Sequence, residues 1–421
     1  MPLLEASLWI GGERRSSSTG KAFDVVNSIT QQIVTQASAA SSQDVIDAIE
    51  AADRVQPAWE AVPWRVKRDL FIKATNLLKT KYVQRIITTT TAEIASLESW
   101  VIRDETFGAV SYLLEAVVDV TQLTRETKPI VLKSAELSPA SNQILVRVLY
   151  EAGLSKGFTG SDRVRKILAG EAAKYFKPCI FEMGGKIPVV VLNDANVKKA
   201  ARSILSSGMV HAGQVSTSTK RVIVQSSIAK EFIESATTLA KNIRVKGGDP
   251  HILALSSKDF VYRVLLLVKD AKDRSGEILV GDLTAHGAHV NPHIVLGVEP
   301  GWSLWEQESY GPVLAIKVVE MEEEAIKMAN ATDYSLSGAI WTSDMAKGLI
   351  LGRQIRSGFV QVNGLTFPRE PGIQVRGLEG ESGYGLFDVE HLTQKRVLVL
   401  NSDAIPVPFL ADLRDSNGVH F

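Results

Sequence analysis

The sequence has little cysteine, no excess of charge and no long apolar run. Cys179 is the single cysteine among 421 residues, which excludes an internal disulfide and favours a reducing compartment such as the cytoplasm. Lys plus Arg and Asp plus Glu both number 47, so neither nucleic acid nor an anionic membrane is an expected partner. No segment has the length of a membrane span or the order of a signal peptide. The sequence predicts a soluble protein whose partners are small molecules or copies of itself.

The length of the whole chain permits two or three domains. The first third of the chain has the apolar spacing of helices. Ser41 and Ser42 are candidate N-caps for a helix in which Val45, Ile49 and Ala52 recur at helical spacing. A second helix has its apolar stripe over residues 70–78. Both helices are predicted to cover a sheet.

From residue 128 onward, short apolar runs alternate with helices. Strands are expected at 130–132, 179–181, 188–192, 221–225, 313–319 and 358–362. Helices are expected at 138–153, 164–172, 228–243, 261–271 and 322–328, and a further helix through Ala200 and Ile204. This alternation predicts an α/β fold with a largely parallel sheet. The helices at 138–153 and 164–172 follow each other with no strand between them, which predicts either a missing strand or a local departure from the doubly wound pattern.

Several motifs stand in an order that chance rarely supplies: FEMGGKIPVVVL, HAGQVSTSTKRVIVQ, QESYGPVLAI, SGFVQVNG and ESGYG. Together with LWIGGE, FDVVN, VLKSAE and FTGS, they make nearly the whole chain resemble the aldehyde dehydrogenase superfamily. The later segments are most similar to salicylaldehyde and vanillin dehydrogenases. LWIGGE with FDVVN resembles the amino-terminal hairpin of that family.

The resemblance implies an aldehyde dehydrogenase-like α/β fold in three stretches. Residues 1–182 correspond to an incomplete Rossmann-type cofactor domain, shortened near 123–129 and 157–158. Residues 183–372 correspond to an α/β catalytic domain. Residues 373–421 return to the cofactor domain and end in an oligomerisation tail, whose apolar run at 397–400 is expected to form a homo-oligomer by adding to a partner's sheet edge.

The resemblance also implies a reaction. A cysteine thiolate attacks an aldehyde, a hydride passes to NAD or NADP, and water hydrolyses the thioester with a glutamate as base. Glu182 matches the general base, and the nucleophile position is occupied by Ser216. The positions that match cofactor contacts are Lys133, Glu136, Ser161, Gly184, Glu308 and Tyr310. Glu136 would accept a ribose 2′-hydroxyl and repel a 2′-phosphate, which favours NAD. Each of these residues also has an ordinary structural interpretation as a surface charge, a helix cap or a turn.

Ser216 is the central departure from the family pattern. A serine hydroxyl needs a positioned base, whereas a cysteine thiol ionises in part near neutral pH. His211 lies close in sequence but is expected to be an ordinary packed histidine, and Cys179 is expected to be a small core residue. Between Gln122 and Lys128 the chain also lacks the family's hairpin and the asparagine that supports the oxyanion.

Three interpretations of the function follow from these departures. The first is an NAD(P)-dependent aldehyde dehydrogenase by class, acting on an aldehyde such as an aromatic one, with activity impaired by Ser216 and the missing segments. The second is a catalytically inactive binding or accessory protein. The third is a truncated gene model of a working enzyme. No metal is expected in any of them.

Overall fold

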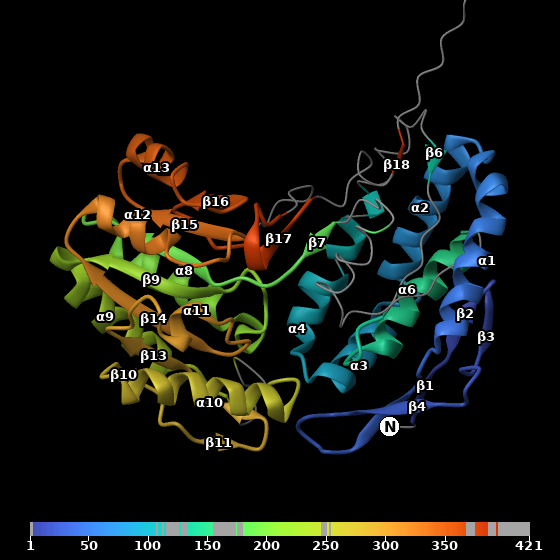
Figure 1. Cartoon of the computed structure of the whole chain (residues 1–421), viewed down its shortest axis with the longest axis horizontal. Coiled ribbons are helices and arrows are strands. Elements are labelled where there is room, and N and C mark those ends of the chain that lie inside the picture. Colours follow the sequence, from blue (N-terminus) through green and yellow to red (C-terminus); the bar gives the residue numbers. More distant parts are fainter. Residues whose placement is uncertain are drawn as a thin grey trace, which may run out of the picture.

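The computed structural model describes residues 3–106, 108–111, 113–114, 126–127, 134–154, 174, 180–245, 251, 254–367, 375–385 and 393–394. The described chain forms two parts (Figure 1). One part is built around a seven-stranded sheet between residues 187 and 362, and the other contains the amino-terminal strands and helices. The predicted α/β class is confirmed by this sheet and its covering helices.

The seven-stranded sheet has the order β10-β13-β14-β9-β8-β15-β16. Its strands are β8 (Ile187–Val191), β9 (Thr219–Gln225), β10 (Glu277–Val280), β13 (His293–Leu296), β14 (Val313–Val319), β15 (Ser337–Trp341) and β16 (Phe359–Val362). All neighbours are parallel except β10 and β13. Every residue of β8 and β9 is buried, because helices cover both faces of a parallel sheet.

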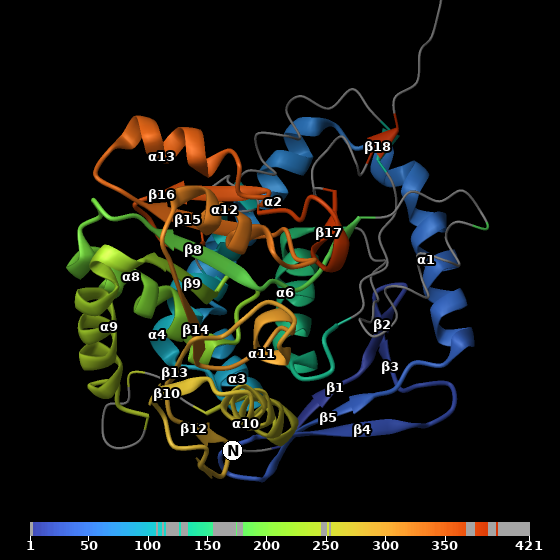
Figure 2. The same cartoon turned by 60° about the vertical axis from the view of Figure 1, so that its left-hand side comes forward.

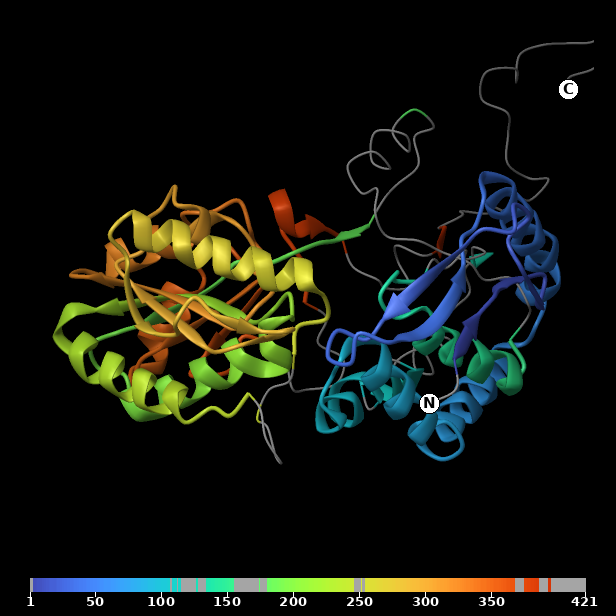
Figure 3. The ribbon, with the colours of Figure 1, turned by 90° about the horizontal axis from the view of Figure 1, so that it is seen from below.

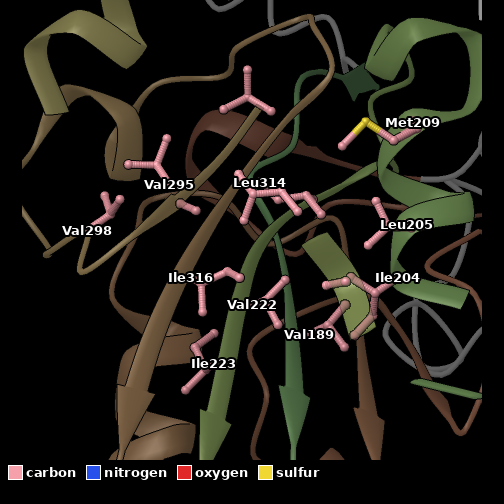
Figure 4. Packing of buried hydrophobic residues seen from close by; sticks show 14 of the residues in the cluster. Val189, Ile204, Leu205, Met209, Val222, Ile223, Val295, Val298, Leu314 and Ile316 are labelled. Carbon is pink, nitrogen blue, oxygen red and sulfur yellow. The ribbon is translucent and has the colours of Figure 1, made fainter. Parts of the chain in front are cut away.

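Helices cover this sheet on both sides. They are α8 (Val197–Met209), α9 (Ser226–Lys241), α10 (Lys258–Asp273), α11 (Ser303–Glu306), α12 (Glu322–Asn330) and α13 (Met345–Gly352). Helices α8 and α9 lie side by side (Figure 2), and α10 lies on the opposite face of the sheet (Figure 3). Figure 4 shows Val189 and Val222 of the sheet packed near Ile204 of α8. This apolar core fixes the ends of the strands from which the candidate site is built.

The amino-terminal strands pair differently from the expected hairpin. β2 (Leu8–Ile10) pairs with β3 (Glu13–Arg15) across Gly11 and Gly12, whose φ values are 61° and 81°. β4 (Ala22–Val26), which contains most of FDVVN, instead joins β1 (Leu4–Ala6) and β5 (Ile33–Ser38) in a three-stranded sheet. The prediction that LWIGGE and FDVVN form one hairpin is wrong, because two glycines that tolerate positive φ already close a tight turn after β2.

The longer helices that accompany these strands among the described residues are α1 (Ser42–Glu60), α2 (Trp64–Lys79), α3 (Val83–Ile94) and α6 (Pro139–Ala152). Ser41 caps α1 as predicted, in a capping box with Asp44. The expected apolar face of α1 is wrong, since Val45 and Ile49 are 43% and 46% exposed. Of the three predicted residues only Ala52 is buried, together with two other alanines, Ala48 and Ala51. The short helix α4 (Glu98–Trp100) and the π-helical turn Val101–Thr106 follow α3 along the chain.

The apolar stripe of α2 is confirmed, with Leu70, Ala74 and Leu78 buried. It packs against α6 in a helical cluster rather than against a sheet. Helix α6 ends at Gly153 as predicted, with φ of 119°. The packing partner of α2 could not be predicted, because an amphipathic stripe reports burial and not the identity of the covering element.

The start of α6 is capped by a distant side chain. Ser138 is the N-cap residue and Pro139 follows it at the start of the helix, but the Ser138 side chain makes no cap bond. The buried carboxylate of Glu93, from α3, accepts hydrogen bonds from the backbone N–H groups of Ala140 and Ser141, both at 2.9 Å. A carboxylate at the positive end of a helix satisfies these unpaired donors as a local cap would.

The chain returns to the amino-terminal part through two short pairings. β17 (Gly383–Tyr384) pairs with β7 (Phe181–Glu182), and β18 (Thr393–Gln394) pairs with β6 (Glu126–Thr127). Several predicted features lie outside the described residues. They are the strand 130–132, the helix 164–172, the joins at 123–125, 128–129 and 157–158, Cys179 and the tail run 397–400. No helix among the described residues has the length and hydropathy of a membrane span.

Candidate active site

Three loops meet at the amino-terminal end of β8. The first runs from Glu182 through Gly184 and Gly185 into β8, the second contains Ser216, and the third contains Glu308. A Cβ atom on Gly185 would lie 2.3 Å from the carbonyl oxygen of Ser216, and one on Gly184 would lie 2.1 Å from Oε2 of Glu308. Only glycine fits at such distances. The glycine pair therefore lets the Glu182 loop approach the other two loops closely.

Replacing Gly185 by alanine is expected to destabilise the protein by about 1–3 kcal/mol, since the added methyl group must displace the Ser216 backbone. Gly352→Ala is the matched control. A Cβ at Gly352 would meet its nearest atoms at ordinary distances of 3.6 and 3.7 Å, and alanine favours helix. Urea unfolding of both variants measures the difference. Equal stabilities for the two variants would contradict the close approach at Gly185.

Glu308 lies at the centre of the junction and is only 7% exposed. Its Oε1 accepts a hydrogen bond from the backbone N–H of Gly185 at 3.0 Å. Burial raises the pKa of Glu308, while the hydrogen bonds from Gly185 and Tyr310 and the charge of Lys220 act in the opposite direction. Tyr310 adopts a positive φ of 43° and stacks on Phe260 of α10 with ring centroids 5.4 Å apart. The structure thus brings Gly184, Glu308 and Tyr310 together.

A buried lysine joins the second and third loops. Nζ of Lys220 donates to the carbonyl oxygens of Gly213 and Gly311, at 2.6 and 3.0 Å. Burial lowers the pKa of Lys220 to about 7. Sequence reasoning missed this residue, although a Lys-Arg pair inside an otherwise apolar buried strand was a usable signal, because buried charges need partners.

Two further buried basic residues, Lys186 and Arg221, lie near Lys220. Arg221 donates to the carbonyl oxygens of Lys186, Met328 and Ala329 and lies over the ring of Trp305 at 5.0 Å. The ammonium of Lys186 has no hydrogen-bond partner among the described residues, and burial together with the charges of Lys220 and Arg221 holds its pKa well below the usual range. Arg221 therefore joins the residue before β8 to the last residues of α12 through hydrogen bonds to their carbonyl oxygens.

Glu182 stands at the end of β7, opposite Gly383, and its side chain is exposed. Partial desolvation raises its pKa. The following loop is fixed from the carboxyl-terminal segment, since Ser382 Oγ donates to the carbonyl oxygen of Gly184 at 2.9 Å. A carboxyl group with a raised pKa on a held loop next to the Ser216 loop can act as a proton acceptor.

Ser216 lies in a turn and is half-buried. Among the described residues its hydroxyl makes no hydrogen bond to any side chain. His211 is packed as expected: it stacks on Trp100 at 5.8 Å, its Nδ1 lies 3.2 Å from Ser96 Oγ, and burial lowers its pKa to about 4. A neutral histidine held in this way does not activate the serine.

His211 and Ala212 redirect the chain from α8 toward Ser216. Their φ values are 47° and 55°, inside the short 3-10 helix Val210–Gly213. Such left-handed conformations cost free energy in residues other than glycine. Packing of the His211 ring against Trp100 holds this conformation.

A cavity of about 590 Å³ lies beside this segment. Its lining includes Trp100, Met209, His211, Leu365 and Phe367. It comes close to the Ser216 loop, because Thr366, between two lining residues, donates from Oγ1 to the carbonyl oxygen of Thr217 at 2.6 Å. The cavity is large enough for a small organic molecule and offers aromatic and aliphatic surface.

The family resemblance also places Asn363 and Thr366 in a loop that shapes the substrate tunnel. Asn363 and Glu136 lie apart from this junction. Asn363 bonds to the backbone of Thr342 through both ends of its amide, at 3.0 and 2.8 Å, so it joins the ends of β15 and β16. Glu136 is exposed ahead of α6, in the amino-terminal part. Lys133 and Ser161 lie outside the described residues. In the part of the chain that is described, no group of three or more His, Cys, Asp or Glu side chains could hold a metal ion.

The family model described as "Aldehyde dehydrogenase family" matches residues 14–130 and 156–397. The chain is 27% identical to a vanillin dehydrogenase from Pseudomonas fluorescens, over 95% of this chain and 98% of that protein. It is 26% identical to a salicylaldehyde dehydrogenase from Pseudomonas putida, over 96% and 100%. The crystal structure of a salicylaldehyde dehydrogenase from Pseudomonas putida G7 complexed with salicylaldehyde superimposes with a TM-score of 0.89 at 24% identity, over 96% and 100%. On this evidence the chain belongs to the aldehyde dehydrogenase family.

Proposed function

We propose that this chain binds an aromatic aldehyde beside the Ser216 loop and oxidises it with NAD far more slowly than its relatives do. The family supplies the reaction type, the oxidation of aldehydes. The observation that carries the proposed impairment is Ser216 itself, a hydroxyl at the nucleophile position with no hydrogen-bonded base among the described residues. Such a hydroxyl stays protonated near neutral pH.

The chemistry explains why this exchange matters. A nucleophile must lose its proton as it bonds to the aldehyde carbon, and the proton needs an acceptor. A thiol gives it up readily near neutral pH, but a serine hydroxyl does not. If an acyl group did form on Ser216, it would be an ester, which water attacks less readily than a thioester. The first of these two effects slows formation of the covalent adduct from which the hydride must leave.

Two observations support an aromatic substrate. The cavity beside the Ser216 loop presents the rings of Trp100, His211 and Phe367, and aromatic pairs gain free energy in stacked or edge-to-face geometry. The names of the similar proteins, vanillin and salicylaldehyde dehydrogenase, also refer to aromatic aldehydes.

One group at the junction, the carboxylate of Glu308, fits the binding of a nicotinamide cofactor. A carboxylate can accept about four hydrogen bonds, and Glu308 uses two acceptor positions for Gly185 and Tyr310. The rest could bind the hydroxyls of the nicotinamide ribose, while Glu136 would bind the adenosine ribose, and Lys133 and Ser161 would contribute to the same cofactor. When bound, NAD accepts the hydride that leaves the substrate carbon.

Calorimetric titration of the full chain tests the cofactor. We expect NAD to bind more tightly than NADP, because Glu136 repels a 2′-phosphate. Glu136→Gln should reduce this preference by roughly tenfold or more, while Glu50→Gln, at an exposed residue of α1, should leave it unchanged. Equal affinity of the unmodified chain for the two cofactors would contradict the role of Glu136, and no binding of either would favour the missing segments as the deeper defect.

A second candidate function is a catalytically inactive binding or accessory protein, and Ser216 favours it as well. A third interpretation is a truncated gene model. The alignment with the vanillin dehydrogenase extends over 487 positions, more than the 421 residues of this chain, so that relative has residues without a counterpart here. Sequencing the transcript distinguishes the third interpretation from the other two.

The domain boundaries at 1–182, 183–372 and 373–421 also remain a proposal. They are supported by the seven-stranded sheet, which lies within residues 187–362, and by the pairing of β17 with β7. Association into a homo-oligomer through the carboxyl-terminal tail is part of the same proposal, as is a cytoplasmic location, for which the single cysteine is the support.

A further inference from the structure

A second cavity, of about 240 Å³, lies in the amino-terminal part of the molecule. It is lined by residues 3–5 around β1, by β3, and by one face each of α3 and α6. One water molecule needs only roughly 10–15 Å³ of such space. The cavity therefore has room for a small ion with several oxygens.

Three arginines from three different elements line this cavity: Arg14 of β3, Arg85 of α3 and Arg147 of α6. No carboxylate among the described residues forms an ion pair with any of them. Other arginines of the chain do have such partners, as in the pairs Arg54–Glu50, Arg68–Asp69 and Arg356–Glu379. Among the described lining residues, Glu5 is the one that carries a carboxylate.

Arg14 and Arg85 are exposed and Arg147 is half-buried, and contacts hold two of the three arginines, Arg14 and Arg147. Arg14 donates to Ser7 Oγ at 3.2 Å, and the guanidinium of Arg147 lies 5.9 Å from the ring centroid of Trp9. The pKa of Arg147 is lowered first by burial and then by the charges of Arg85 and Arg14. Like charges held close together repel one another, so an anion bound among these arginines would gain favourable electrostatic free energy.

We propose that this cavity is a binding site for a phosphate group, either free phosphate or the end of a small phosphorylated metabolite. A guanidinium presents a planar fork of donors that matches two oxygens of a phosphate. Three forks from separate elements surround a tetrahedral dianion better than a planar carboxylate. The site contains neither Ser216 nor Glu182, so it is independent of the proposed oxidation chemistry.

Thermal unfolding and calorimetry of the full chain with inorganic phosphate test the proposal. At constant ionic strength, phosphate well above its Kd is expected to raise Tm by about 2–5 °C relative to chloride. Arg85→Gln should weaken phosphate binding by roughly tenfold. Without phosphate it should leave Tm unchanged or raise it, because the substitution relieves repulsion. A purely structural role of Arg85 would lower Tm instead and would overturn the assignment.

The matched control is Arg54→Gln, an arginine on α1 whose side chain is 69% exposed. It should respond to phosphate as the unmodified chain does. Since phosphate also stabilises proteins non-specifically, an equal response of Arg85→Gln and the unmodified chain would overturn the proposal. A response to succinate as strong as that to phosphate would overturn the phosphate assignment.

Titration with a phosphate monoester such as glycerol 3-phosphate distinguishes a phosphorylated metabolite from free phosphate as the ligand. Tighter binding of the ester than of inorganic phosphate assigns the site to a phosphorylated metabolite, and tighter binding of inorganic phosphate assigns it to the free ion. Both results support a phosphate site, and binding of neither overturns it.

Discussion

Replacing Ser216 by cysteine is expected to raise the rate of NADH formation from aromatic aldehydes by roughly three orders of magnitude or more. The loop geometry already holds position 216 against Gly185 and near the cavity that contains Trp100 and His211. The substitution supplies an ionisable sulfur without adding volume that the half-buried turn could not accept. The measurement is NADH production with a panel of aromatic and aliphatic aldehydes.

Thr217→Cys is the matched control, since it places a thiol one residue away in the same loop. It should give no gain. Turnover by Ser216→Cys alone would show that the scaffold is intact and only the nucleophile is missing. If neither variant turns over, the missing segments are the deeper defect. A family-like rate from the unmodified chain would contradict the proposed impairment.

Removing Glu182 is expected to have the second largest effect. In the Ser216→Cys background, Glu182→Gln should lower the steady-state rate by about 10²–10⁴-fold, the usual contribution of a general base. The amide keeps the size of the side chain but cannot accept a proton. Glu379→Gln is the control, because Glu379 is exposed and pairs with Arg356 on the surface. Equal rates for the two variants would exclude Glu182 as the base.

The pH profile identifies the role of Glu182 more directly. The base acts in its deprotonated form, so the rate should rise with pH and level off above the pKa of Glu182. Partial desolvation raises this pKa, so the acid limb should lie above the range of an ordinary glutamate. Glu182→Gln should abolish the limb, and an unchanged limb in that variant would assign it to another group.

Much of the fold could be predicted from local pattern. The strand at 313–319 and the helices around 228–243 and 261–271 are confirmed, because their apolar periodicity is strong and their boundaries carry clear polar signals. The strand Ser337–Trp341 and the strands between Glu277 and Leu296 were not predicted. Short strands that contain glycine or histidine give weak periodic signals.

The failures have a common physical cause. Glu93 caps α6 from 47 residues away, and Val45 of α1 faces water while small alanines are buried. In both cases a long-range contact decided an outcome that local preference left open. The same holds for Lys220, whose two carbonyl partners come from separate loops.

The sequence by itself determined the α/β class, the order of the motifs and the oxygen atom at position 216, because each of these depends on residue type and spacing alone. Only the tertiary structure decided that Gly185 touches the Ser216 backbone, that Glu308 bonds to Gly185, and that Arg14, Arg85 and Arg147 share one cavity. These contacts join residues far apart in the chain, and their distances depend on how the helices and sheets pack against one another.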